Sequence, residues 1–345
     1  MVDRSYCMSS FLALRYVEKR GVSFSEGVPY RRPELKQEEP IMVRTASDID
    51  EAIERQIVSL KQKYKKIGLL LSGGMDSAIL ASYLRGCDAY TFRFMGGAFQ
   101  ADELHRAEQF ASYYGLFLHY VDISWETVEQ HLPAVMNAKG GPVHSIEPQI
   151  CQAALQAKQD GVEVMIIGDG SDYVFGGMDQ LLSKDWGFDE FKHRCIYVEP
   201  EGVLADPQSM DYLFERYRTE NGIDFMKFYE TVITEESYGS YENAFIAAGL
   251  QYYDPYERLK MAEPLDLKRI RSGESKYLIR ELFRSRYPGI PVPEKLPMPR
   301  PVDEYFKAWE GPSRPEFLKD IDMSQYSGNQ KWLIWCLESF LNSLD

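Results

Sequence analysis

The chain has 345 residues, a length that suggests about two domains and allows a sizeable core without disulfide or metal staples. A hydrophobic fraction of 44% argues against a disordered chain, and no apolar run is long enough to predict a membrane span. The formal charge of −14 disfavours nucleic acid as the main partner, because an acidic surface repels phosphates. The start of the chain lacks the layout of a signal peptide, and its 5 cysteines form no CxxC pair, which predicts a reducing, cytoplasmic location.

Three regions follow one another along the chain. Residues 1–46 form an N-terminal extension that ends in the polar stretch GVPYRRPELKQEEP, typical of a surface connection. Residues 47–185 alternate between helical and strand patterns, which predicts an α/β domain with a doubly wound parallel sheet. From about Trp186 the strand pattern disappears, and amphipathic segments over 186–345 predict a mainly helical region on the substrate side.

The elements of the α/β region have clear individual signals. A helix is expected from about Ser47 to Lys66, with Ser47 and Asp50 resembling a capping box. Ile67 to Leu71 form a short apolar run, the pattern of a strand buried on both faces. The other expected strands cover 89–94, 116–123 and 162–167, and the other expected helices cover 101–114 and 149–158.

The strongest local signal is SGGMDS, residues 72–77, between the first buried strand and a helix. Glycines allow a sharp turn and a close approach of backbone N–H groups, and a helix N-terminus adds partial positive charge at the same point. Ser72 and Ser77 can donate hydroxyl hydrogen bonds. The stretch predicts a pyrophosphate cradle, although a Gly-Gly corner with a purely structural role is the alternative. No GK[ST] follows, so it is not a Walker A loop.

SGGMDS resembles the pyrophosphate loop of the ATP pyrophosphatases, which cleave ATP to AMP and pyrophosphate. A second stretch, IGDGSDYVFGGM at 167–178, resembles the GEGxDExFGGY motif of asparagine synthetases and, nearly as well, the GYGxDxxxGGM motif of β-lactam synthetases. The segments SKYLIRELF and AGLQYYDPY also fit that group. The resemblance covers about residues 50–310 and implies the ATP pyrophosphatase fold.

One departure from the family is informative. Glutamine-dependent asparagine synthetases begin with a nucleophilic cysteine and a glutaminase domain, whereas only about 45 residues precede the synthetase part here. Cys7 is therefore expected to be a small buried hydrophobe rather than a nucleophile. The nitrogen donor is expected to be ammonia or an amine, not glutamine.

The resemblance implies ATP and Mg²⁺ as cofactors. Asp76 and Asp172, each after a predicted strand, would hold magnesium that bridges the phosphates, with helix-cap and turn roles as the alternatives. Adenine would lie near Leu70, Leu71, Phe94 and Gly168. The complete set of expected nucleotide-binding residues is Leu70, Leu71, Ser72, Gly73, Gly74, Met75, Asp76, Ser77, Phe94, Gly168 and Gly170.

Four residues are candidates for the chemical steps. Asp169 replaces the glutamate of asparagine synthetases and could orient or deprotonate an amine, or only stabilise a turn. Lys276 and Lys295 are rival candidates for the cation that neutralises developing charge, with Arg300 as a weaker one.

Several polar residues have two interpretations. His144 is either a pocket residue or an ordinary loop histidine, and the carboxylates in TEESYGSYENAF more often form a solvated face than a substrate contact. The last helix, with Trp332 and Trp335, is expected to be core or a subunit contact, which leaves a homo-oligomer open.

The resulting expectation is an ATP-dependent synthetase that adenylates a small carboxylate, releases pyrophosphate and transfers the acyl group to ammonia or an amine, forming an amide or a lactam. The expected partners are small molecules, with no nucleic acid and no membrane. The alternative is a catalytically silent nucleotide-binding subunit that supports a partner enzyme.

Overall fold

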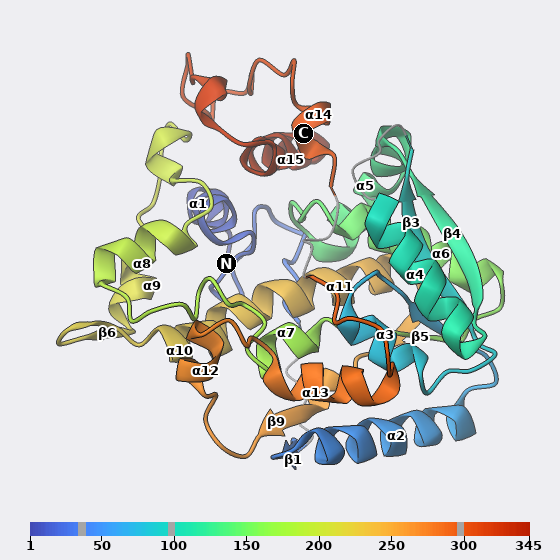
Figure 1. Cartoon of the computed structure of the whole chain (residues 1–345). Helices are drawn as coiled ribbons and strands as arrows, with labels where there is room; N and C mark the ends of the chain where they lie inside the picture. Colours follow the sequence, from blue (N-terminus) through green and yellow to red (C-terminus); the bar gives the residue numbers. More distant parts are fainter. Residues whose placement is uncertain (34–38, 96–100, 295–299) are drawn as a thin grey trace.

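The computed structural model describes residues 1–33, 39–95, 101–294 and 300–345. Its centre is a parallel sheet of 5 strands in the order β4-β3-β2-β5-β8 (Figure 1). The chain moves from β2 outward to β3 and β4, then returns to the other side of β2 for β5 and β8, so the predicted doubly wound parallel sheet is confirmed. The strands are β2 (Ile67–Leu70), β3 (Asp88–Phe94), β4 (Phe117–Ile123), β5 (Val164–Ile166) and β8 (Gln251–Tyr253).

Helices cover both faces of this sheet and enclose two separate cores. On β5, Ile166 faces one core while its neighbours Met165 and Ile167 face the other, as the period of two along a strand requires. One core is shared with α5 (Trp125–Lys139), α6 (Glu147–Gln159) and α11 (Thr234–Ala248). The other is shared with α2 (Ala46–Lys63), α3 (Met75–Ala81), α4 (Ala101–Tyr114) and α13 (Tyr277–Arg286).

The capping box of α2 lies two residues before the predicted one. The Thr45 side chain accepts from the backbone N–H of Asp48, and Asp48 Oδ2 accepts from the Thr45 N–H at 3.0 Å. Thr45 has the extended backbone of an N-cap, whereas Ser47 is already inside the helix, so the pairing of Ser47 with Asp50 was wrong.

The expectation that the strand pattern ends near Trp186 was wrong, because four short strands lie beyond it among the described residues. β8 adds a fifth strand to the edge of the sheet, where Gln251 to Tyr253 pair with β5. Three residues are too few to show a periodic pattern, which is why the sequence did not reveal it. Two short strands, β1 (Ile41–Val43) and β9 (Leu259–Met261), form a separate parallel pair, and β6 (Arg218–Thr219) and β7 (Gly222–Ile223) form a hairpin.

The rest of the molecule is mainly helical, as predicted. The longest of these helices is α15 (Gly328–Leu344), whose Trp332 is buried and whose Trp335 contacts Trp125 on α5. The remaining elements are α7 (Gly170–Val174), α8 (Phe188–Cys195), α9 (Asp211–Glu215), α10 (Phe225–Phe228), α12 (Leu267–Arg271), α14 (Val302–Tyr305), the π-helical turn Tyr229–Ile233 and the 3₁₀ turns Pro200–Gly202, Tyr256–Arg258 and Met323–Gln325.

The N-terminal segment is part of the core rather than a loose arm. Its helix α1 (Arg4–Leu14) has nine buried residues and packs against α15 (Figure 1). Cys7 on this helix is completely buried, as predicted, and burial raises the pKa of its thiol to about 12. Within the described ranges, no helix is both long and apolar enough to span a membrane.

Candidate active site

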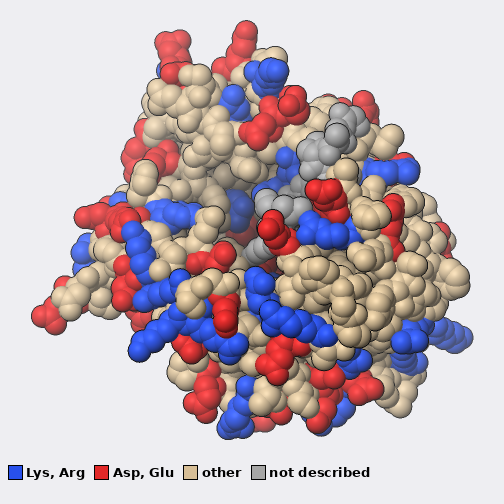
Figure 2. All heavy atoms as spheres, viewed as in Figure 1, with Lys and Arg blue, Asp and Glu red and all other residues tan. Residues whose placement is uncertain are grey.

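A cavity of about 420 Å³ opens at the carboxyl ends of β2 and β5, where the strand order reverses. This is the place where open α/β sheets bind ligands. The face in Figure 2 is hollowed near its middle, with basic and acidic side chains around the hollow. The residues that line the cavity come from the loops after these two strands, from β3, α4 and α11, from the loop before α6, from the start of α13 and from the N-terminal segment. Pro293, Glu294 and Arg300 line it as well.

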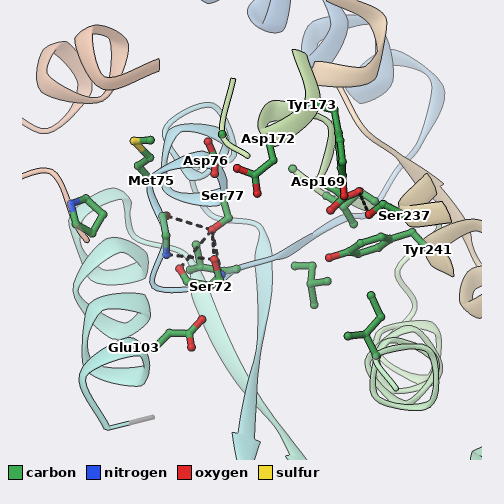
Figure 3. A pocket seen from close by; sticks show the side chains of 18 of the residues that line it. Ser72, Met75, Asp76, Ser77, Glu103, Asp169, Asp172, Tyr173, Ser237 and Tyr241 are labelled. Atoms are coloured by element: carbon green, nitrogen blue, oxygen red, sulfur yellow. Dashed lines mark hydrogen bonds between the residues drawn. The ribbon is translucent and has the colours of Figure 1, made fainter. Parts of the chain in front are cut away.

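The glycine-rich loop forms one wall of the cavity (Figure 3). Ser77 Oγ accepts a hydrogen bond from the Ser72 N–H at 3.0 Å, and Ser72 Oγ accepts one from the Gly74 N–H at 3.2 Å. The two serine hydroxyls lie 3.0 Å apart. They hold the loop in a tight turn at the start of α3, and its role as a pyrophosphate cradle stays a prediction.

One charged group in the cavity consists of Asp76, Asp172 and Lys276. Lys276 Nζ lies 2.7 Å from Asp76 Oδ2 and 2.6 Å from Asp172 Oδ1. The Lys276 side chain is 3% exposed, whereas the side chains of Asp76 and Asp172 are 22% and 27% exposed. Burial alone would lower the pKa of Lys276, but the two carboxylates outweigh it and raise that pKa, so the lysine is a permanent cation.

Two features of the backbone bring these three groups together. Lys276 has φ of 53°, in the left-handed region that disfavours residues with a Cβ. A Cβ on Gly177 would lie 1.9 Å from Asp172 Oδ1 and 2.2 Å from Lys276 Cε, so only glycine fits there. The second glycine of the FGG stretch therefore allows the close approach of Asp172 and Lys276.

A third carboxyl group, on Asp169, lies opposite the glycine-rich loop (Figure 3). Its Oδ2 accepts a hydrogen bond from Ser237 Oγ at 2.7 Å, and Tyr173 and Tyr241 lie beside it. Burial raises the pKa of Asp169 to about 8, and nearby carboxylates such as Asp172 add to the shift although the Ser237 hydrogen bond opposes it. A group with this pKa can accept or donate a proton near neutrality.

Most of the expected nucleotide-binding residues line the cavity, but three do not. Phe94 is buried in the core, and Phe92 lines the cavity instead, because β3 continues past the end of β2 and carries Phe94 beside Ile123. Gly73 packs against Glu103, where a Cβ would lie 2.6 Å from the Glu103 carbonyl oxygen. The N–H of Gly170 already donates to the buried carboxylate of Asp254 at 2.7 Å. The expected residues that do line it are Leu70, Leu71, Ser72, Gly74, Met75, Asp76, Ser77 and Gly168.

Of the two lysine candidates, Lys276 lines the cavity, and Lys295 lies outside the described residues. Neighbours of Lys295 in the sequence, Glu294 and Arg300, do line it. His144 lines it as well, which decides between its two interpretations.

Sequence reasoning missed several other lining residues. Glu236 belongs to the acidic stretch that was expected to be a solvated face, yet it is buried. Its neighbour Glu235 has a different role, because it pairs with Arg20 and Arg32. Arg15 carried no sequence signal, because nothing around it resembles a motif. Ser237 and Tyr241 follow a π-helical turn, and no pattern in the sequence predicts such a turn.

The cavity can be tested for its fit to Mg²⁺, an ion that proteins usually hold through one or two carboxylates and phosphate oxygens. Asp76 and Asp172 provide two carboxylates that already converge on one cationic nitrogen and keep access to the cavity. No group of three or more His, Cys, Asp or Glu that could hold a metal by itself occurs in the described parts of the chain. The donor set therefore fits magnesium bound together with a phosphate ligand.

Comparison with known proteins gives a family. The model of the family described as asparagine synthase matches residues 45–237, which include the glycine-rich loop and the GDGSDYVFGG stretch. A Methanocaldococcus jannaschii protein, named putative glutamine-hydrolysing asparagine synthetase 1, is 26% identical over 160 residues, which are 43% of this chain and 28% of that protein. The chain thus matches less than a third of the length of this relative.

Two solved structures share 12% identity with the chain. The NMN synthetase of Francisella tularensis aligns over 67% of this chain and 95% of its own, with a TM-score of 0.29. A tRNA thiolase of Methanococcus maripaludis aligns over 93% of this chain and 89% of its own, with a TM-score of 0.32. The family match covers more than half of the chain and includes both motifs that build the cavity, so the chain belongs to the asparagine synthase family.

Proposed function

We propose that this chain is an ATP-dependent carbon–nitrogen ligase. It adenylates a small carboxylate, releases pyrophosphate, and transfers the acyl group to ammonia or an amine to give an amide or a lactam. Membership of the asparagine synthase family supports an ATP-using synthetase in general. The observation that carries the proposal is the Lys276 ammonium held between Asp76 and Asp172 beside the glycine-rich loop.

The nucleotide would bind along the glycine-rich wall. Its phosphates would meet the N–H groups and hydroxyls around Ser72 and Ser77, and its adenine would lie against Leu70, Leu71 and Gly168. Magnesium bound by Asp76 and Asp172 would neutralise the charge of the phosphates. A second substrate would then reach the α-phosphate through the rest of the cavity.

Lys276 would stabilise the charge that develops when a carboxylate oxygen attacks the α-phosphate and pyrophosphate leaves. Its ammonium is buried, permanently charged and fixed by two carboxylates, so little reorganisation is needed as the charge forms. Removing one such preorganised group typically costs about a hundredfold or more in turnover.

Asp169 would act in the second half of the reaction, when the amine attacks the carbonyl carbon and AMP leaves. Its carboxyl group faces the cavity opposite the loop, with a raised pKa and a hydrogen bond from Ser237 that fixes its orientation. In its ionised form it can accept the proton that the attacking amine loses.

The proposal is tested by carboxylate-dependent exchange of labelled pyrophosphate into ATP, measured across a panel of small carboxylic acids. Exchange that needs one acid, with AMP as the nucleotide product, is the expected result. ADP and orthophosphate as primary products would contradict the proposed chemistry. Nucleotide binding without exchange, for every acid and amine in the panel, would favour the silent subunit instead.

A further inference from the structure

A second group of charged side chains lines the cavity on the Asp169 side. It consists of Arg15 from the N-terminal segment, His144 from the loop before α6, Glu236 from the first turn of α11, and Arg300. Glu236 precedes Ser237, whose hydroxyl binds Asp169, so the group adjoins the place where the acyl acceptor would react. Both arginines lie outside residues 45–237, the part of the chain that the family model matches.

The two arginines converge on one nitrogen of His144. Arg15 Nη1 lies 3.0 Å and Arg300 Nη1 lies 2.8 Å from His144 Nε2. A guanidinium group can only donate hydrogen bonds, so Nε2 must be the acceptor and the ring proton must be on Nδ1. His144 is therefore neutral. It lies between the two guanidinium groups and does not balance the positive charge of either one. Burial and then the charges of Arg15 and Arg300 lower the pKa of His144 well below its usual range, which agrees with this assignment.

The positive charge in this group is not balanced. Glu236 Oε2 accepts a hydrogen bond from Arg15 Nη2 at 2.8 Å, but this carboxylate is the only ionised acid in direct contact with either arginine among the described residues. Arg300 has its pKa lowered by burial and by the nearby charge of Arg15, the sign of a cation without a full counter-charge. Arg15 Nε is buried and has no hydrogen-bond partner in the described part of the chain. One further negative charge would make the group neutral.

The backbone of Arg15 is in an energetically unfavourable conformation. Its φ of 66° lies in the left-handed region at the end of α1, where glycine would be favoured by about 1 kcal/mol. Among the described residues only three non-glycine residues have positive φ, and two of them, Arg15 and Lys276, are cations of this cavity. A residue with a Cβ at a strained position points to a role for its side chain.

Contacts also fix the N-terminal segment against the residue pair after α8 and against the start of the loop that carries His144. The Tyr197 N–H donates to the Ala13 carbonyl at 3.0 Å, and the Arg31 N–H donates to the Lys139 carbonyl at 2.7 Å. A Cβ on Gly140 would lie 2.2 Å from the Pro29 carbonyl oxygen, so this contact admits only glycine. Arg15 is thus part of a rigid wall.

We propose that Arg15 and Arg300 form a subsite for a carboxylate of the substrate, separate from the carboxyl group that is adenylated. The substrate would then carry two acid groups, and the N-terminal segment would select for the second one. A monoanionic carboxylate fits better than a phosphate dianion, because it neutralises the group while Glu236 would repel a second negative charge. The inference rests on the proposed function in one respect, namely that the other carboxyl group of the substrate is the one adenylated. Binding of a diacid to the subsite can be measured without turnover.

The test compares the variants Arg15→Gln and Arg300→Gln with the wild type and with Arg20→Gln. Arg20 is a matched control on the same segment, because it pairs with Glu235 and does not line the cavity. Binding of succinate, glutarate and adipate, each with butyrate as the monoacid comparison, is measured by calorimetry with the 345-residue chain. Affinity for Mg–ATP is measured in parallel.

In the wild type and in Arg20→Gln, at least one diacid should bind at least tenfold more tightly than butyrate, and both cavity variants should lose this preference. Their affinity for Mg–ATP should stay within about threefold. A wild type that binds no diacid more tightly than butyrate, or an unchanged preference in both cavity variants, would overturn the inference. Loss of Mg–ATP binding in either variant would also overturn it, because the arginines would then belong to the nucleotide.

Arg15→Lys guards against a folding failure of Arg15→Gln, because it keeps the charge but not the forked geometry. The Arg15→Lys variant should have the melting temperature of the wild type, and its affinity for the preferred diacid should be severalfold lower. If no acid supports pyrophosphate exchange although diacid binding still depends on Arg15, the proposed function fails and the subsite stands.

Discussion

On the glycine-rich wall of the cavity, the charged and polar side chains with a proposed role, other than Lys276, come from two short stretches, SGGMDS and GDGSDYVFGG, which directly follow strands of the sheet. On the opposite wall, Arg15, His144 and Arg300 come from three places that are more than a hundred residues apart in the sequence. The first wall can be read as motifs because its geometry is set by local turns. The second wall is created only by tertiary packing, so its chemistry had no local pattern.

The largest expected effect on turnover comes from changing the two aspartates of the first wall. Asp76→Asn and Asp172→Asn keep the shape of each side chain but remove one charge. Turnover should fall by on the order of a hundredfold or more, because transition-state charge stabilisation worth several kcal/mol is lost. Asp179→Asn, in the same segment but exposed, is the control and should have near-normal turnover. Normal turnover in both cavity variants, with intact folding, would refute the metal role.

The lysine on the first wall gives the next largest effect. Lys276→Met should lower turnover by about a hundredfold and should also lower the melting temperature, because it leaves two carboxylates without their cation. Lys295→Ala is the rival variant. Lys295→Ala should leave the melting temperature nearly unchanged. If its turnover is near that of the wild type, the developing charge is stabilised by Lys276 or Arg300 instead.

Packing at Gly177 gives a third way to disturb the first wall without changing a charge. In Gly177→Ala the new methyl group would displace Asp172 and Lys276, so we expect a loss of about 1–3 kcal/mol of stability and reduced turnover. Gly187→Ala is the matched control, since nothing lies within 4 Å of a Cβ there. Chemical denaturation of both variants checks the prediction, and equal stability would contradict the close approach.

The last prediction concerns the pH dependence of stability at Asp169, which lies between the two walls. Its pKa of about 8 in the fold exceeds the value of about 4 of an unfolded aspartate, so ionising it destabilises the native state. Its contribution to stability is complete below about pH 4 and is lost as the pH rises towards 8. Unfolding by urea at a series of pH values should therefore show wild type losing stability relative to Asp169→Asn over this window. Parallel pH profiles would contradict the raised pKa.

The sequence predicted the sheet and the first wall well for physical reasons. Buried parallel strands have continuous apolar runs, and a phosphate cradle needs glycines at fixed positions after a strand. It failed for β8, which is too short for a periodic signal, and for Phe94, whose place depends on how far β3 extends past β2. It also gave Gly170 a nucleotide contact, although a distant carboxylate, Asp254, takes its N–H.

The second wall shows the same limit more clearly. Glu236 was expected to be solvated because it stands in an acidic stretch, but the fold buries it against Arg15, 221 residues earlier. No pattern in one sequence reports such a pairing. Positive φ at Arg15 and Lys276 likewise becomes visible only in three dimensions.

The most direct test of the proposed chemistry is the fate of a carboxylate oxygen. The acid substrate is labelled with oxygen-18 in its carboxyl groups, and the AMP formed with ATP, magnesium and the amine is analysed by mass spectrometry. If an acyl-adenylate forms and the amine then breaks its carbon–oxygen bond, one labelled oxygen must leave with AMP. Transfer of one label to AMP is the predicted result, whereas unlabelled AMP, or label in orthophosphate with ADP as the other product, would contradict adenylation.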